Sequence, residues 1–191
     1  MNRVSPVVLN LIILNVILFF GIQFLLPYPE WKNYFYLCSP STGFFHPVQI
    51  VTHMFNHADF QHLLFNMMSL YFIGPFVEQI LGAKRFFILY FLSGIIAGIF
   101  QLLLTTSCGL GASGAVFGVV AAFATMLPNM EMMLMFIPFP VKAKYMAIGL
   151  VALGLYFGIS GQMSGIGHFA HVGGAVVGFL CIRYWKLANI R

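Results

Sequence analysis

Runs of apolar residues long enough to cross a lipid bilayer constrain the fold of this chain more than any other feature. Six runs can be drawn, since each needs about 20 residues to cross a hydrocarbon core of about 30 Å. They cover residues 4–26, 60–80, 86–104, 113–127, 145–159 and 168–184. Only 7% of the 191 residues are charged, against about 25% in a soluble domain. The chain is therefore predicted to be an all-α membrane protein, a six-helix bundle that forms one domain over residues 1–191.

The basic residues indicate how this bundle is oriented. Eight of the nine lysines and arginines fall on one side of the six-span arrangement, and only Lys32 falls on the other. Since lysine and arginine accumulate in cytoplasmic loops, both termini are predicted to be cytoplasmic. The net charge of +5 then reflects membrane topology and does not indicate a nucleic-acid partner. A cleavable signal peptide is not expected, because the apolar run after Arg3 is too long and lacks a small-residue cleavage site.

The cysteines give no sign of a disulfide or metal framework. Cys38, Cys108 and Cys181 are far apart in the sequence and form no C-x-x-C motif. They are expected to be ordinary small apolar residues. The connection over residues 28–59 is too apolar for a solvated linker, so part of it is predicted to lie in the membrane interface.

Other polar residues outside the motifs below receive structural interpretations. His53 and His57 have the i, i+4 spacing of zinc ligands on a helix. There is no H-E-x-x-H motif, and no carboxylate or cysteine is placed to complete a site, so neither a metal nor a cofactor is expected. Glu78, at the inner end of the second run, is expected to meet Lys84, Arg85 or interfacial water.

One glycine-rich stretch begins the fourth run and holds a single hydroxyl. In this stretch, GLGASGAVFG, Gly111 and Gly114 flank Ser113 with the spacing G-x-S-G. Glycine permits a tight turn, and a helix N-terminus offers unpaired backbone N–H groups to a developing oxyanion. Taken alone, the motif is better explained by packing, because small residues are common where membrane helices meet.

The predicted topology brings polar residues from three spans to a similar depth. Ser113 lies at the outer end of the fourth span, and His171 lies one turn into the sixth. His62 and Asn66 lie near the outer start of the second span, on one helix face. Polar groups in hydrocarbon usually face the bundle interior. For His62 with Asn66 alone, an interhelical hydrogen-bonding pair is the simpler interpretation.

The fourth run is too short to span the membrane fully. Its 15 residues cover about 22 Å of a core of about 30 Å, so Ser113 is expected below the outer surface, beside a water-accessible cavity. The motifs Gly114-x-x-x-Gly118 and Gly174-x-x-x-Gly178 allow the fourth and sixth helices to approach closely. Such packing is expected to bring the serine and the imidazole within hydrogen-bonding distance, as nucleophile activation requires.

Three motifs together resemble those of rhomboid intramembrane serine proteases in their minimal six-span bacterial form. They are His62-Leu-Leu-Phe-Asn66, Gly111-Ala-Ser113-Gly114 and Ala170-His171-Val-Gly-Gly174, with Gly178 one turn further. They occur in the family's order on the second, fourth and sixth spans. The resemblance covers nearly the whole chain, and the ordered set is far more specific than any one motif.

The resemblance implies a role for each matching residue. Ser113 is the expected nucleophile, and His171 is its general base and then the acid for the leaving amine. His62, Asn66 and the Ser113 backbone N–H are expected to stabilise the oxyanion. Phe117 stands where many members have a tyrosine that stacks on the catalytic imidazole, and a phenyl ring can stack in the same way.

Two departures and two neighbouring histidines remain outside this catalytic set. Some members have a Trp-Arg pair in the first loop, whose nearest equivalent here is His46-Pro-Val-Gln49. His57 is expected to brace that loop. His168, three residues before His171, is expected to have a structural or interfacial role.

The function implied by the resemblance is that of an intramembrane serine endopeptidase. It would cleave single-span membrane proteins in or near their transmembrane segment, in the lipid bilayer of a bacterial cytoplasmic membrane, without nucleic acid, metal or cofactor. One alternative is a catalytically inactive relative that acts as a binding or quality-control factor. Another is a small transporter or channel, which predicts inverted repeats or broken helices, and neither is seen in the sequence.

Overall fold

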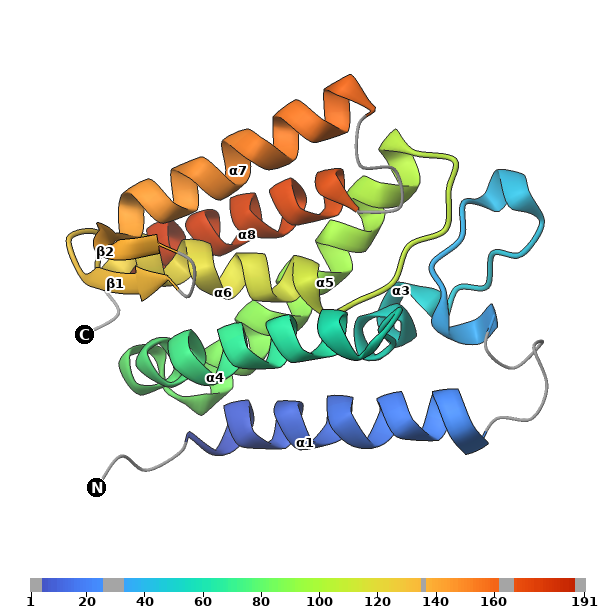
Figure 1. Ribbon diagram of the computed structural model, residues 1–191, viewed down its shortest axis with the longest axis horizontal. Helices are drawn as coiled ribbons and strands as arrows, with labels where there is room; N and C mark the ends of the chain where they lie inside the picture. Colours follow the sequence, from blue (N-terminus) through green and yellow to red (C-terminus); the bar gives the residue numbers. More distant parts are fainter. Residues whose placement is uncertain (1–4, 26–32, 135–136, 162–166, 188–191) are drawn as a thin grey trace.

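Six long helices make up most of the computed structural model, which describes residues 5–25, 33–134, 137–161 and 167–187 (Figure 1). The long helices are α1 (Pro6–Phe20), continued by the π-helix η1 (Gly21–Leu25), α4 (Phe60–Leu81), α5 (Ala83–Leu104), α6 (Ser113–Met126), α7 (Ala143–Ser160) and α8 (His168–Leu187). The first loop contains the short turns η2 (Asn33–Phe35), η3 (Pro40–Thr42), α3 (Gln49–Thr52) and η4 (His53–Phe55). An antiparallel hairpin of β1 (Glu131–Leu134) and β2 (Ile137–Lys142) occupies the loop predicted before α7. Residues 4 and 26 of the first predicted run, and the basic residues Arg3, Lys32 and Arg191, lie outside the described residues.

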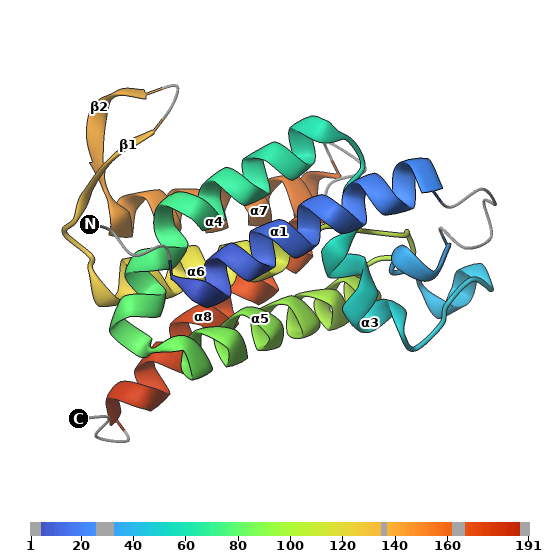
Figure 2. The same cartoon turned by 90° about the horizontal axis from the view of Figure 1, so that it is seen from below.

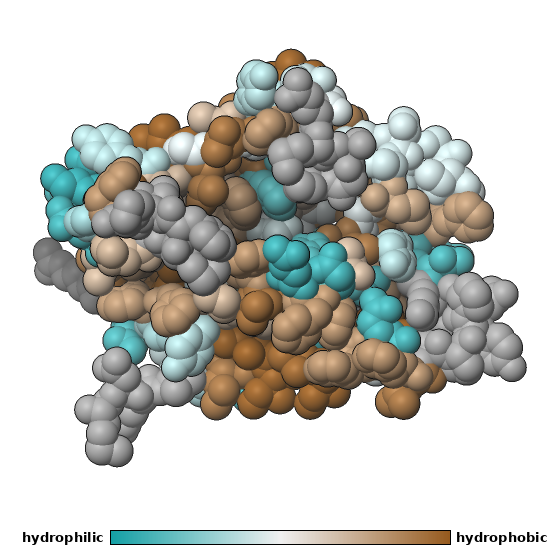
Figure 3. All heavy atoms as spheres, viewed as in Figure 1, coloured by the Kyte–Doolittle hydropathy of each residue, from teal (hydrophilic) through white to brown (hydrophobic). Residues whose placement is uncertain are grey.

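Four of the described helical segments are long and apolar enough to cross a membrane: Pro6–Leu25, α4, α5 and α7. Helix α6 is apolar but has only 14 residues, so it is about 21 Å long and shorter than the hydrocarbon core. Large apolar side chains are exposed along the helices, and they form most of the lower part of the face in Figure 3, over α1. Such a surface is suited to lipid, and the prediction of an all-α integral membrane protein is confirmed.

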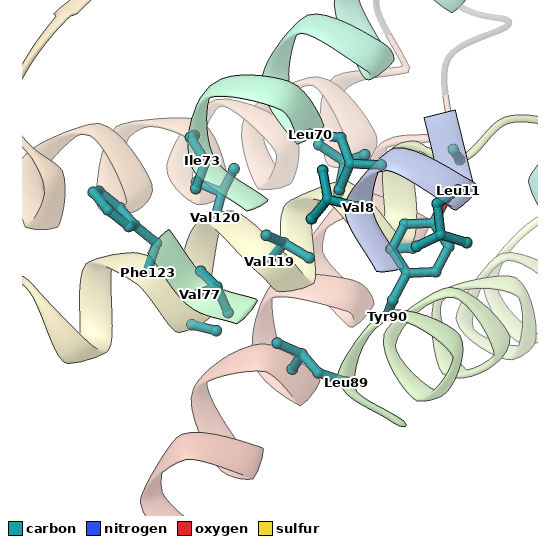
Figure 4. Close-up of a cluster of buried hydrophobic side chains, with 14 of the residues drawn as sticks. Val8, Leu11, Leu70, Ile73, Val77, Leu89, Tyr90, Val119, Val120 and Phe123 are labelled. Carbon is teal, nitrogen blue, oxygen red and sulfur yellow. The ribbon is translucent and has the colours of Figure 1, made fainter. Parts of the chain in front are cut away.

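Helix α6 is the most enclosed element, with ten of its 14 residues buried. It lies between α4, α5 and α8, as the two views in Figures 1 and 2 agree. Apolar side chains from α1, α4, α5 and α6 form the core beside it (Figure 4). The labelled members are Val8, Leu11, Leu70, Ile73, Val77, Leu89, Tyr90, Val119, Val120 and Phe123. The start of α6 is thereby held in a fixed place among its neighbours.

Glu78 of α4 has a different partner from the one predicted. Its side chain is buried, and its carboxylate oxygens accept hydrogen bonds from the backbone N–H groups of Val7 (3.2 Å) and Val8 (2.9 Å). The first N–H groups of a helix have no partner within the helix, and a helix N-terminus attracts negative charge. The expectation that Glu78 meets Lys84, Arg85 or water is therefore wrong. Nothing in the sequence aligns the start of α1 with the inner end of α4.

Cys38 and Cys108 form a disulfide, so the expectation of three unpaired cysteines is also wrong. The two residues are 70 positions apart in the sequence. They become neighbours because the first loop and the turn before α6 run antiparallel, where Leu37 and Gly109 exchange backbone hydrogen bonds of 2.8 Å. This contact joins two loops, and no periodicity in the sequence reports it. Cys181 is a free cysteine in the described part of the chain.

Removing this disulfide is expected to destabilise the fold by about 2–4 kcal/mol, because the cross-link restricts a long loop of the unfolded chain. Thermal unfolding in detergent compares the wild type with the double variant Cys38→Ser/Cys108→Ser, which should unfold at a lower temperature. Cys181→Ser is the matched control, since it removes a thiol without removing a cross-link. A double variant as stable as this control would contradict the prediction.

Candidate active site

The chain turns sharply at Gly111 and then presents Ser113 as the first residue of α6. Gly111 has a φ of +121°, a backbone conformation that favours glycine. A Cβ atom at this position would lie 2.7 Å from Cε1 of His62. The Gly111 backbone N–H donates to the carbonyl oxygen of His53 (2.9 Å). The motif glycine is thus required for both conformation and space, and the His62 ring lies directly against the turn.

Ser113 and His171 meet between α6 and α8. The Oγ atom of Ser113 and the Nε2 atom of His171 are 2.7 Å apart, within the range of a hydrogen bond. When the imidazole is neutral, the hydroxyl donates to Nε2 and the ring proton resides on Nδ1. A serine in this arrangement can pass its proton to the imidazole as it attacks.

Two pairs of glycines explain how the two helices come so close. A Cβ atom on Gly174 would overlap the carbonyl oxygen of Gly114. One turn further, a Cβ atom on Gly178 would overlap the carbonyl oxygen of Gly118. The backbones of α6 and α8 are therefore in direct contact at successive turns, as small-residue motifs in membrane helices permit. The Ser113–His171 contact depends on this approach.

Phe117 fixes the plane of the His171 ring. The two rings are stacked, with centroids 4.3 Å apart and an interplanar angle of 9°, so the contact needs no tyrosine hydroxyl. His168 lies three residues before His171 on α8. Its ring is nearly perpendicular to that of His171, with the ring centroids 6.3 Å apart. The Nε2 atom of His168 is buried and has no hydrogen-bond partner within the described part of the chain. The imidazole of His171 is thus positioned by aromatic packing.

His62 and Asn66 lie one turn apart on α4. Asn66 is buried, and its amide nitrogen donates to the backbone carbonyl of His62 (3.0 Å). Asp59 caps α4 by accepting a hydrogen bond from the backbone N–H of His62 (2.7 Å). Asp59 therefore holds the start of α4. The structure brings His62 to the serine turn and leaves the Asn66 amide on the helix backbone.

His57, at the end of the first loop, packs against His62. Its ring is fully buried and packs edge-on against His62, with centroids 5.1 Å apart, and against Phe19 at 6.5 Å. Its backbone carbonyl accepts a hydrogen bond from Nε2 of Gln23 (3.2 Å). His57 thus links the end of the first loop to α1 and α4.

Gln101 of α5 lines two cavities, of which the smaller adjoins Ser113. The smaller, of about 30 Å³, is also lined by Gly98, Ser113 and Ala170, and the larger, of about 200 Å³, is also lined by His62. Each exceeds the roughly 10–15 Å³ that one water needs. The Oε1 atom of Gln101 is buried without a partner among the described residues, so it is available to a water. Sequence reasoning missed this residue, although a glutamine inside an apolar run is a detectable signal.

His53 lies beneath the serine turn and makes the fold sensitive to acid. Its ring is buried, and its Nδ1–H donates to the carbonyl of Gln49 (2.7 Å). Burial lowers the pKa of His53 to about 4, against about 6.5 in an unfolded chain. Between these values the unfolded state binds a proton that the folded state does not. The free energy of unfolding is therefore expected to fall by about 3 kcal/mol as the pH drops from 6.5 to 4.

Unfolding measured in detergent between pH 4 and pH 7 tests this expectation. In the variant His53→Gln, the fall in the free energy of unfolding between pH 6.5 and pH 4 should be smaller by the contribution of one proton, about 3 kcal/mol. His46→Gln is the matched control: this first-loop histidine stacks on Tyr34 with centroids 4.6 Å apart, and its replacement should keep the wild-type profile. Superimposable profiles for the wild type and His53→Gln would rule out the assignment.

The fold and the site together define an integral membrane protein that holds a serine–histidine pair between two of its helices, next to a glycine turn. Residues 45–186 match the family described as Rhomboid domain. The chain therefore belongs to the rhomboid family, as its three motifs predicted. This family is known for serine intramembrane proteases, and some of its members are inactive.

Several curated relatives are similar over about two thirds of the chain. Rhomboid protein 1, mitochondrial, from Saccharomyces cerevisiae is 33% identical over 140 residues, which are 70% of this chain and 40% of that protein. Rhomboid protease AarA from Providencia stuartii is 33% identical over 153 residues, 66% of this chain and 52% of the relative. Rhomboid protease GluP from Bacillus subtilis is 31% identical over 132 residues, 69% of this chain and 24% of the relative. The match thus spans between about a quarter and half of each relative's length.

Proposed function

We propose that this chain is an intramembrane serine endopeptidase that cleaves single-span membrane proteins in or near their transmembrane segment. The observation that carries the proposal is the 2.7 Å contact between Ser113 Oγ and His171 Nε2 in a member of this family. The relatives from Providencia stuartii and Bacillus subtilis are named as proteases, which supports the class of reaction.

The proposed reaction is acyl transfer to Ser113 followed by hydrolysis. The Oγ atom attacks the scissile carbonyl carbon while Nε2 of His171 accepts the hydroxyl proton. When the C–N bond breaks, His171 returns that proton to the leaving amine. A water then attacks the acyl-enzyme and gives one proton to His171, which passes it back to Ser113 as the new carboxyl group leaves.

The oxyanion of each tetrahedral intermediate is assigned to donors around the serine turn. These are the Ser113 backbone N–H, which is unpaired at the start of α6, and the side chains of His62 and Asn66. The contact of the His62 ring with Gly111 supports its part in this set. One such donor is typically worth about 10²–10³ in rate. The two cavities lined by Gln101 are large enough to hold the water that the hydrolytic step consumes.

The proposal includes six spans in one domain, with both termini in the cytoplasm and Ser113 toward the outer side of a bacterial cytoplasmic membrane. The basic residues of the α4–α5 turn, the β2–α7 junction and the end of α8 support it, since these segments lie at the end of the bundle opposite the start of α6 (Figure 1). The disulfide near Ser113 supports it too, because disulfides persist in oxidising compartments such as the periplasm.

Labelling by a fluorophosphonate tests the proposal without knowledge of the substrate. The purified wild type in detergent should be labelled on Ser113, and both Ser113→Ala and His171→Ala should lose the label. Ser69→Ala is the matched control, because the Ser69 hydroxyl bonds to the Phe65 carbonyl within α4 (2.8 Å). A folded wild type that takes no label would instead favour an inactive relative that acts as a binding factor.

A further inference from the structure

A further cavity lies at the end of the bundle opposite Ser113. It has a volume of about 310 Å³. Four helices contribute to it: the end of α4, the start of α5, and the ends of α6 and α8. Figure 2 shows the α4–α5 turn beside the C-terminal end of α8. The lining residues are Ile80, Leu81, Arg85, Thr125, Met126, Ile182, Trp185 and Lys186.

The charge of this cavity is positive and uncompensated. Arg85 and Lys186 line it, and no acidic side chain belongs to the described lining. Glu78, the nearest carboxylate along α4, is buried and bonded to the start of α1. Glu131 lies on the hairpin, where its backbone pairs in register with Lys142. Two cations are thus available to an anion in this cavity.

The remaining lining is suited to a lipid. Ile80 is 52% exposed and continues the cavity onto the apolar outer surface of α4. Trp185 is partly buried in the wall, and an indole combines an apolar body with an N–H donor that suits the boundary between headgroups and acyl chains. The cavity also lies at the ends of α4 and α5 that face each other, and both helices are long and apolar enough to cross a membrane. Lipid headgroups are expected at the ends of such helices.

We propose that this cavity binds the phosphate headgroup of an anionic phospholipid, with Arg85 and Lys186 as the charged ligands and Trp185 against the start of the acyl chains. Basic pockets between membrane helices are suited to anionic headgroups, and each basic residue near such a surface contributes about a fivefold preference. Two of them predict a preference of about thirtyfold for an anionic over a zwitterionic lipid. The proposal does not depend on the proposed protease activity.

Fluorescence of Trp185 can report the occupant directly. The chain has two tryptophans, so Trp31→Phe leaves Trp185 as the only one. This protein is reconstituted in phosphatidylcholine vesicles that contain either brominated phosphatidylglycerol or brominated phosphatidylcholine as a quencher. Quenching should occur at a far lower mole fraction of the anionic lipid, and Arg85→Gln/Lys186→Gln should reduce the preference to within about twofold. Equal quenching by the two lipids in the unmodified cavity would overturn the proposal, whether or not the variant folds.

Two further arms distinguish the cavity from the surrounding basic surface and a lipid from free phosphate. Lys142→Gln/Lys144→Gln is the matched control, since it removes two positive charges at the same end of the bundle but outside the cavity. If this control loses the preference as the cavity variant does, the effect belongs to the whole surface and the proposal is wrong.

Inorganic phosphate, compared with chloride at equal ionic strength, tests the source of the ligand. Relief of quenching by phosphate alone would assign the cavity to free phosphate and overturn the lipid assignment.

Discussion

Replacing Ser113 with alanine is expected to abolish cleavage of a transmembrane substrate, with a loss of at least about 10⁴-fold in kcat. Alanine removes the attacking oxygen and changes little else, because the hydroxyl's partner is the His171 ring (2.7 Å). The loss of one partly buried hydrogen bond should lower the free energy of unfolding by only about 1 kcal/mol. Cleavage of a model single-span protein in proteoliposomes, beside thermal unfolding of the same samples, measures both quantities.

The two members of the pair should act as a unit. His171→Ala is expected to cost about as much activity as Ser113→Ala, and the double variant no more than either, because each change alone disables the same nucleophile. Ser69→Ala should cleave at the wild-type rate. If Ser113→Ala retained wild-type cleavage while staying folded, the nucleophile would have to be sought elsewhere.

The parts of this structure that could be predicted are those governed by local spacing. Apolar run length predicted helices at the observed places, and the glycine spacing at Gly174 and Gly178 predicted the close approach of α6 and α8. The resemblance to the family implied that Phe117 would stack on the imidazole of His171, and the two rings are stacked. The first two of these predictions depend on run length or on a glycine repeat within each helix, and the third depends on the family's motif.

The parts that could not be predicted are contacts between segments with no shared period. The Cys38–Cys108 disulfide joins two loops, and Glu78 meets the first turn of a helix 70 residues away. The sequence marks Gln101 as a polar residue in an apolar run, but its contact with the cavity that includes Ser113 and with the cavity that includes His62 comes from tertiary packing. A single sequence carries no register between such segments, so their partners emerge only from tertiary packing.

Adding one methyl group at Gly174 is expected to separate α6 from α8 and disable the site. In Gly174→Ala the new Cβ would overlap the carbonyl oxygen of Gly114. A helix backbone cannot yield as a flexible side chain does, so the two helices must move apart. Overpacking of this kind costs about 1–3 kcal/mol of stability. A shift of about 1 Å between Ser113 and His171 should reduce the rate of cleavage and of fluorophosphonate labelling about 100-fold.

Gly149→Ala in α7 separates this steric effect from a general effect of alanine in a membrane helix. A Cβ atom at Gly149 would meet nothing within 4 Å, so this variant should retain wild-type stability and labelling. Thermal unfolding and the rate of labelling in detergent compare the two variants. If Gly174→Ala matched Gly149→Ala in both, the backbone contact between α6 and α8 would not be what holds the serine and the histidine together. The aromatic contact of Phe117, which constrains the same imidazole from within α6, would then have to hold the pair.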